Sequence, residues 1–208
     1  MNIFQRSWAI VRENRRAYLI INATYYGLVA VCMVYVAFNR PLQTLLMNAV
    51  GGAFSEGPLA PVGAAYGGRN PWAATALTFV VNLLIGSLLT ITVPSLIVPF
   101  SGLLMGAYRA VLWGLMLSPA HPDLGLRAAP HMLTLALEGQ AYVIALLAAY
   151  VQGRSFLWPK SVGVEGRRQG YGEGLKRTAW LYVLVIALLA VAALYEALEV
   201  IYLIPILG

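Results

Sequence analysis

Five predominantly apolar stretches, each long enough to cross a bilayer as a helix, constrain this chain more than any other feature. A bilayer core about 30 Å thick requires roughly 20 apolar residues per helix, because backbone polar groups there must bond to each other. The stretches are residues 17–38, 72–93, 96–117, 130–152 and 178–204. None alternates polar and apolar residues with a period of two, which excludes a transmembrane β-barrel. The sequence therefore predicts one all-α integral membrane domain over residues 1–208, a polytopic bundle of about five transmembrane helices.

The distribution of charge supports this interpretation and sets the expected orientation. Only 11% of the residues are charged, against about 25% in an ordinary soluble domain. Ten of the 14 Lys and Arg residues lie in two segments, one before the first stretch and one between the fourth and fifth. Five crossings place both segments on one face, and the positive-inside rule assigns that face to the cytoplasm. We therefore expect an N-in, C-out topology, with the lipid bilayer as a partner and no nucleic acid.

The segments between the stretches carry predictions of their own. Residues 41–54 have apolar side chains near helical spacing, which predicts a short helix lying on or dipping into the membrane. The Gly- and Pro-rich residues 57–68 are predicted to be irregular. Two prolines, Pro94 and Pro99, predict either a tight apolar hairpin or an unwound helix start between the second and third stretches.

Two terminal or polar segments each leave two interpretations open. Residues 1–16 mix arginines with apolar side chains, so they form either an interfacial amphipathic helix on an anionic leaflet or a plain extension of the first helix. Residues 153–177 are basic and Gly-rich, which is typical of a topology-setting linker but also fits a segment that docks a partner.

Small residues four apart predict where helices pack closely, because association in lipid depends on close backbone approach. The third stretch has such a ridge, and the fourth has a matching row of alanines. We therefore expect these two helices to form a tight antiparallel pair. The residues are Gly102, Gly106, Ala110 and Gly114 on the third stretch and Ala141, Ala145 and Ala149 on the fourth.

Ionisable residues inside the stretches are costly in lipid and normally face a partner or a water-filled cavity. Arg109 and Glu138 each lie about 12 Å below the same surface, counted at 1.5 Å per residue, and Glu196 lies at the same level. The sequence predicts that these three side chains form one polar cluster, with Gln140 or Asn82 as lesser members. Such a cluster is either a partner site or ion path, or an internal ion pair that fixes helix register.

The sequence contains no strong catalytic or cofactor motif. The helical HExxH of a metalloprotease is missing, and no phosphate-binding loop is present. His121, Asp123 and His131 are near each other in sequence, yet two histidines and an aspartate in a Pro/Gly loop more often are simply solvated, so no metal is expected. Neither histidine lies deep in a span, as a haem ligated across helices would need. We therefore expect neither an enzyme nor a bound cofactor.

Several motifs are distributed over nearly the whole chain. They are Ser7-Trp8 through Arg15-Arg16-Ala17-Tyr18, Asn82 and Gly86, the stretch from Ser101-Gly102 to Gly106, Leu137-Glu138-Gly139 followed by Tyr142 to Gly153, and Ala193-Leu194-Tyr195-Glu196-Ala197. Together these motifs resemble those of the stage II sporulation protein M-like membrane proteins. The chain differs from that family at Thr134, where many relatives carry a histidine four residues before the glutamate of the fourth helix.

The resemblance implies a non-enzymatic, multi-pass protein of the prokaryotic cytoplasmic membrane. The sporulation member is similar to a scaffold that holds cell-wall hydrolases at the membrane, and relatives elsewhere are often associated with ABC-type transport genes. The expected function is therefore a scaffold or accessory subunit of a larger membrane complex, with other membrane-protein subunits as partners. The alternative is a membrane component of a transporter, although five spans without an internal repeat argue against a self-sufficient carrier.

Overall fold

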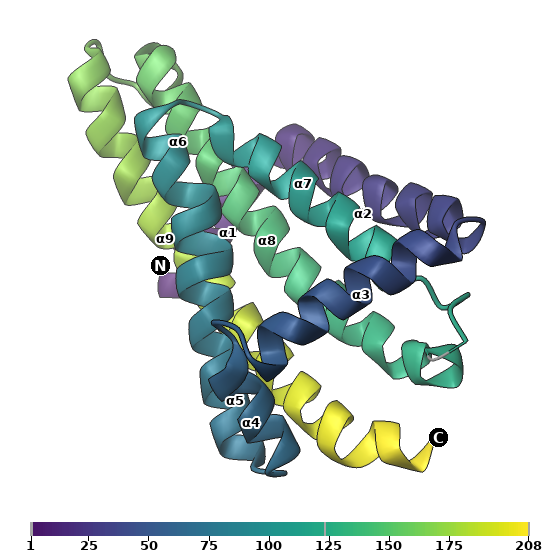
Figure 1. Cartoon of the computed structure of the whole chain (residues 1–208). Helices are drawn as coiled ribbons and strands as arrows, with labels where there is room; N and C mark the ends of the chain where they lie inside the picture. Colours follow the sequence, from purple (N-terminus) through teal and green to yellow (C-terminus); the bar gives the residue numbers. More distant parts are fainter. Residues whose placement is uncertain (1, 123, 208) are drawn as a thin grey trace.

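The computed structural model describes residues 2–122 and 124–207, and every regular element in that part of the chain is helical (Figure 1). Four helical segments there are long and apolar enough to cross a bilayer. They are Arg15–Ala37, Pro71–Ile97, Ala128–Leu157 and Arg167–Ile206. The predicted all-α membrane bundle is therefore confirmed.

The third predicted stretch, residues 96–117, forms a shorter helix than expected. Its first two residues, 96 and 97, belong instead to helix α6 (Val93–Ile97), which ends the preceding span. A turn follows, in which Phe100 has a left-handed φ of 71°. Helix α7 (Ser101–Met116) then has 16 residues, about 24 Å at 1.5 Å per residue. The predicted tight hairpin between the two stretches is confirmed, and it shortens α7 below the thickness of a bilayer core.

The second span changes its helix type along its length. It begins as α5 (Pro71–Val80), continues as the π-helix η1 (Val81–Thr92) and ends as α6. Pro71 occupies the first turn, and the Asn70 side chain caps the backbone of Ala73. Long π-helices are rare and are commonly found at functional sites, and nothing in the sequence composition predicted this one.

Helices α8 (Ala128–Leu157) and α9 (Arg167–Leu198) form a long antiparallel pair at the centre of the bundle. A short 3-10 helix, η3 (Pro159–Val162), joins them, and α9 continues into the π-helix η4 (Glu199–Leu203) and the 3-10 turn η5 (Ile204–Ile206). Gly170 packs on the Ser155 carbonyl, where an added Cβ would lie 2.1 Å from the oxygen. Residues 153–177 are therefore mostly two packed helix ends joined by a short turn, because the glycines allow close approach of the helices.

The predicted ridge on α7 is fully buried, but it serves three neighbours rather than α8 alone. An added Cβ on Gly102 would meet the carbonyl of Ile91 in η1, and one on Gly114 would meet α2 (Arg15–Ala37). Only Gly106 packs on α8 in this way, against Leu146. The expectation of a simple α7–α8 pair was therefore too narrow.

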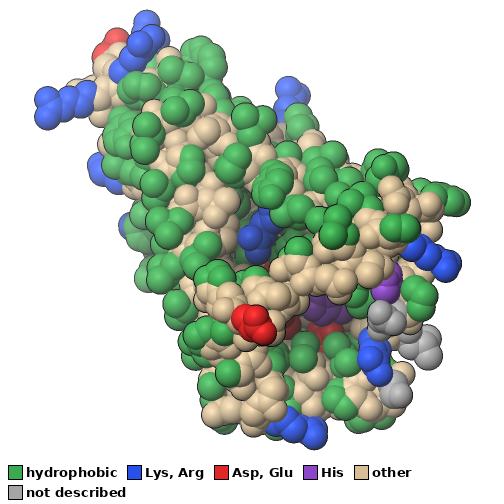
Figure 2. Space-filling view, in the orientation of Figure 1, with side chains coloured by type: hydrophobic (Ala, Val, Ile, Leu, Met, Phe, Trp, Pro, Cys, Tyr) green, Lys and Arg blue, Asp and Glu red, His purple; other side chains and the backbone are tan. Residues whose placement is uncertain are grey.

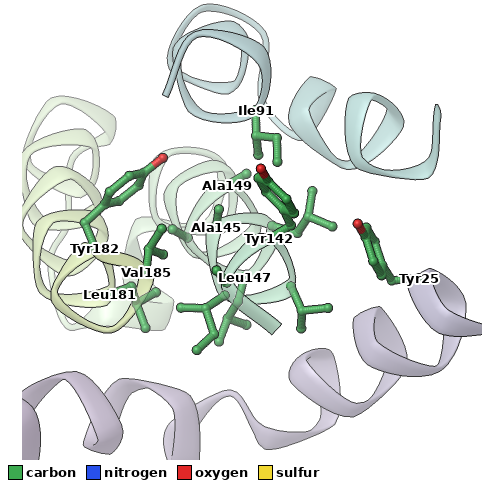
Figure 3. Packing of buried hydrophobic residues seen from close by; sticks show 14 of the residues in the cluster. Tyr25, Ile91, Tyr142, Ala145, Leu147, Ala149, Leu181, Tyr182 and Val185 are labelled. Atoms are coloured by element: carbon green, nitrogen blue, oxygen red, sulfur yellow. The ribbon is translucent and has the colours of Figure 1, made fainter. Parts of the chain in front are cut away.

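The alanine row on α8 is also buried, and α9 accounts for much of that burial. Figure 3 shows Ala145 and Ala149 on the side of α8 that faces α9 and η1, near Tyr182 and Val185. Residue Ala141, one turn earlier, is likewise 0% exposed. Helix α8 is thus surrounded by neighbours and forms the core of the bundle, and α9 is the partner that the alanine spacing did not identify.

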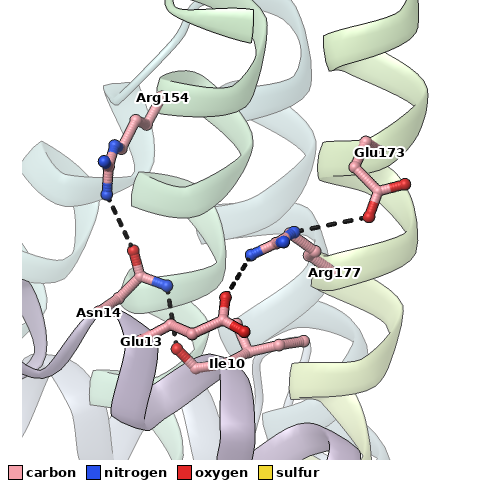
Figure 4. A network of polar contacts seen from close by, with 6 residues as sticks. All are labelled: Ile10, Glu13, Asn14, Arg154, Glu173 and Arg177. Carbon is pink, nitrogen blue, oxygen red and sulfur yellow. Dashed lines mark hydrogen bonds and ion pairs between the residues drawn. The ribbon is translucent and has the colours of Figure 1, made fainter. Parts of the chain in front are cut away.

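The amino-terminal segment forms a separate helix, α1 (Ile3–Glu13), which ends at Asn14 before α2 begins. The Ser7 hydroxyl donates a hydrogen bond of 2.6 Å to the Trp180 carbonyl of α9. Glu13 pairs with Arg177 at 2.7 Å, and Arg154 donates to the Asn14 side chain at 3.2 Å (Figure 4). Both basic segments therefore meet at one end of the bundle, which we call the basic end.

Two further helices cross the opposite end of the bundle. Helix α3 (Arg40–Ser55) confirms the short helix predicted for residues 41–54, and its buried Gln43 donates to the carbonyls of Met116 and Ser118. Helix α4 (Ala60–Gly67) lies where an irregular segment was predicted. That prediction was wrong because Gly63 lets α4 pack against the Phe54 carbonyl, a contact that the local composition does not reveal.

Candidate functional site

A cavity of about 530 Å³ lies between the second span, α7, α8 and α9, on the side that α3 and α4 cover. Figure 2 shows the surface hollowed on both sides of α3, with a basic side chain visible on one side and histidine and acidic side chains on the other. Most of the lining is apolar. The ionisable residues that line it are Arg109, His131, Glu138 and Glu196.

Helix α8 carries a polar stripe of four residues, the first three of which line this cavity. His131, Thr134, Glu138 and Tyr142 follow one another at spacings of three, four and four residues, which places them on one helical face. The stripe extends over about 16 Å at 1.5 Å per residue. It begins near the start of α8 and ends in the middle of the bundle, so it connects a histidine whose side chain is 25% exposed with the buried interior.

Arg109 lies at the inner end of the stripe and is held mainly by aromatic side chains. Its Nη2 donates a hydrogen bond of 2.6 Å to the Tyr142 hydroxyl. The guanidinium carbon lies 3.9 Å from the centre of the Tyr142 ring and 5.0 Å from that of Trp113. Cation–π contacts of this kind are strongest when desolvated, so they offset part of the cost of burying the charge. Its Nε is buried and has no hydrogen-bond partner among the described residues.

Gly86 of η1 makes room for this arrangement. An added Cβ there would lie 2.8 Å from the Tyr142 hydroxyl and 3.2 Å from Nη1 of Arg109. The π-helix therefore brings a bare backbone face against the cation and its tyrosine.

Glu138 is buried and accepts a hydrogen bond from the side-chain amide of Asn82 in η1. It makes no ion pair within 4.0 Å with Arg109, although both residues are described and line the same cavity. The predicted cluster of Arg109, Glu138 and Glu196 thus surrounds one cavity, without direct ion pairs among its members. Asn82 joins it, whereas Gln140 bonds to Tyr18 and Asn22 of α2 and lies elsewhere.

A second buried carboxylate, Glu199, does not line the cavity itself but contacts two residues that do, His131 and Thr134. It is 1% exposed, accepts a 2.5 Å hydrogen bond from Thr134, and lies 3.0 Å from Nδ1 of His131. Sequence reasoning left His131 in a solvated loop and did not pair it with Glu199. The helical spacing from His131 through Thr134 to Glu138 was the signal that could have identified this contact.

Glu196 is the carboxylate of this group that has no bond of its own. It is half-buried and lines the cavity, yet its side chain makes no hydrogen bond or ion pair within the described ranges 2–122 and 124–207. A carboxylate in a largely apolar cavity is costly without a partner. Glu196 is therefore the ionisable residue at which a cationic group of a ligand would gain the most binding free energy.

The two histidines that were weighed as metal ligands have different neighbours in the part of the chain that is described. His121 lies 3.0 Å from the Thr44 hydroxyl, whereas His131 faces Glu199. Asp123 lies outside the described residues. Groups of three or more His, Cys, Asp or Glu side chains arranged to hold a metal are absent from the described residues.

Comparisons with family models, with curated proteins and with solved structures found no match for this chain.

Proposed function

We propose that this chain is a non-catalytic membrane protein that binds a small solute in the cavity beside α8 and serves as the membrane component of a transport system. The single observation that carries the proposal is the cavity itself, which places Arg109, Glu138 and Glu196 around about 530 Å³ between helices of membrane-spanning length. Ligand cavities commonly measure 300–1,000 Å³ with an apolar lining and few polar groups. Ionisable residues in spans often mark substrate or ion pathways.

The charges around the cavity favour a solute that carries positive charge and an apolar body. Among the described residues Glu196 makes no hydrogen bond or ion pair and Glu138 bonds only to a neutral amide, whereas Arg109 is already engaged by Tyr142 and Trp113. A cationic group near Glu196 would receive the compensation that the protein does not provide. Apolar residues such as Phe54 and Met105 would contact the rest of the molecule.

Binding can be tested with benzyltrimethylammonium, a permanently charged amphipathic cation, and with benzylsulfonate as the probe of opposite charge. We expect the cation to raise the melting temperature of the purified protein and the anion to leave it unchanged. Glu196→Gln is expected to weaken the effect at least tenfold, while Glu165→Gln, an exposed carboxylate outside the cavity, keeps it. Equal responses from both variants would exclude the cavity as the binding site.

An accessory subunit or scaffold of a larger complex is the second candidate, and the short helix α7 favours it. A span shorter than the bilayer core is often accommodated by association with other chains. Leu104 and Tyr108 of α7 are 71% and 60% exposed and give a partner an apolar face. Co-purification in gentle detergent with stoichiometric partner chains, without cation uptake by the isolated protein in liposomes, would favour this function over transport.

The topology and the family belong to the same proposal. We place α7 as a fifth crossing and the basic end in the cytoplasm of a prokaryotic cell, which gives an N-in, C-out orientation. The convergence of α1, Arg154 and Arg177 at one end of the bundle supports this placement through the positive-inside rule. Membership of the stage II sporulation protein M-like family rests on the sequence motifs, and both Glu138 and Glu196 of those motifs line the cavity.

A further inference from the structure

A second cavity, also about 530 Å³, lies at the basic end where α1 meets α2. It is separate from the cavity beside α8, and their linings share no residue. The residues that line it are Arg12, Glu13, Asn14, Arg15, Arg16, Ala17, Tyr150 and Arg154.

The charge of this second cavity is strongly positive. Four of its lining residues are arginines, and its single carboxylate, Glu13, is already paired with Arg177 at 2.7 Å. Arg12, Arg15 and Arg16 make no side-chain hydrogen bond or ion pair with any part of the chain that is described. Three guanidinium groups are thus free to bind an anion, and guanidinium forks match phosphate oxygens in geometry.

Asn14, at the junction of α1 and α2, is fixed by bonds to its neighbours. Its side chain donates to the Ile10 carbonyl and accepts from Arg154, so it does not cap α2 (Figure 4). This bond ties Arg154 of α8 to the junction, where it lines the same cavity as the arginines of α1 and α2.

Apolar surface adjoins the cavity on two helices. Leu19 and Ile20, one turn further along α2, are 61% and 66% exposed, and α1 exposes Ile3 and Trp8. A free phosphate would make no use of these surfaces, whereas the acyl chains of a lipid would lie along α2 directly below the headgroup. We propose that this cavity binds the phosphate of an anionic phospholipid headgroup and fixes the α1–α2 junction at the membrane surface.

The test uses the full chain in detergent micelles doped with phosphatidylglycerol or with phosphatidylcholine. We expect phosphatidylglycerol, and not phosphatidylcholine, to raise the melting temperature in a saturable way. The double variant Arg15→Gln/Arg16→Gln is expected to weaken the apparent affinity at least tenfold. The matched control, Arg167→Gln/Arg168→Gln, removes the same charge from the basic end outside the cavity and is expected to change the affinity less than twofold.

Three results would overturn the proposal. Equal losses in the two double variants would show diffuse attraction to the basic end in place of a site. Stabilisation by inorganic phosphate, with displacement of phosphatidylglycerol, would assign the cavity to a free anion. No difference between the two lipids would remove the site altogether. Should the double variant not fold, the single variant Arg12→Gln carries the same comparison against Arg168→Gln.

Discussion

Arg109 is a half-buried cation that relies on aromatic rings and one phenol, with no carboxylate of the described residues within 4.0 Å. This arrangement depends on the missing side chain of Gly86, which lets η1 lie against Tyr142. The sequence predicted Arg109 and Glu138 as members of one polar cluster, and both line the same cavity, because charges inside apolar stretches are conspicuous. It could not identify the aromatic partners, since Trp113 and Tyr142 are common residues in membrane helices and their contact depends on how the helices are rotated.

The first prediction concerns Gly86. Gly86→Ala places a methyl group 2.8 Å from the Tyr142 hydroxyl, and overpacking of this kind costs about 1–3 kcal/mol. We expect a lower melting temperature in detergent. Gly27→Ala is the control, because an added Cβ there has no neighbour within 4 Å. A melting temperature equal to that of the control variant would mean that η1 does not contact Arg109 and Tyr142 as described.

A second prediction concerns the hydroxyl of Thr134. Thr134→Val keeps the shape of the side chain but removes the donor to buried Glu199, and hydrogen bonds to charged groups contribute about 1.5–3 kcal/mol. We expect Thr134→Val to unfold at lower temperature, while Thr134→Ser, which retains a hydroxyl, stays close to the parent protein. Equal destabilisation by valine and serine would indicate that packing, and not the hydrogen bond, sets the cost.

At the scale of elements, apolar periodicity predicted where helices occur but not how they end or change type. The α6–α7 hairpin was predictable because Pro94 and Pro99 restrict the backbone. The π-helix η1 was not, since its i→i+5 bonds depend on tertiary contacts such as those of Ser87 and Thr92 with the Tyr182 hydroxyl. Helix α9 begins earlier than expected because glycines that favour flexibility in isolation serve close packing here.

The packing of α9 on α8 gives a third prediction. Gly170→Ala would place its Cβ 2.1 Å from the Ser155 carbonyl, a backbone atom that cannot rotate away. We expect a melting temperature several degrees below that of Gly172→Ala, which lies in the same helix and has no neighbour within 4 Å. Similar melting temperatures for the two variants would contradict the close approach of the two helices.

At the scale of the whole molecule, the arrangement of the two basic segments is the feature that sequence reasoning predicted best. Both lie at the basic end, as the spacing of the apolar stretches required. The polar cavity belongs to the other half of the molecule, under α3 and α4. Its composition was only partly predictable, because α3 and α4 reach it through contacts such as those of Gln43 and Gly63 that leave no periodic signal in the sequence.

The proposed topology gives the fourth prediction. In a Cys32→Ala background, single cysteines replace exposed Arg168 at the basic end or exposed Arg40 at the start of α3. In intact cells we expect a membrane-impermeant maleimide to label Arg40→Cys and not Arg168→Cys, and permeabilisation to expose both. Labelling of both positions in intact cells, or the reverse pattern, would contradict five crossings with the basic end in the cytoplasm.

Helix α3 crosses the hollow in the surface and is tied at its first turns to Met116 and Ser118 (Figure 2). The entrance is therefore divided into two openings, one on each side of this helix. A solute of the proposed kind would have to pass beside α3, so the attachment of this helix, and not only the charges inside, would bear on which molecules reach the cavity.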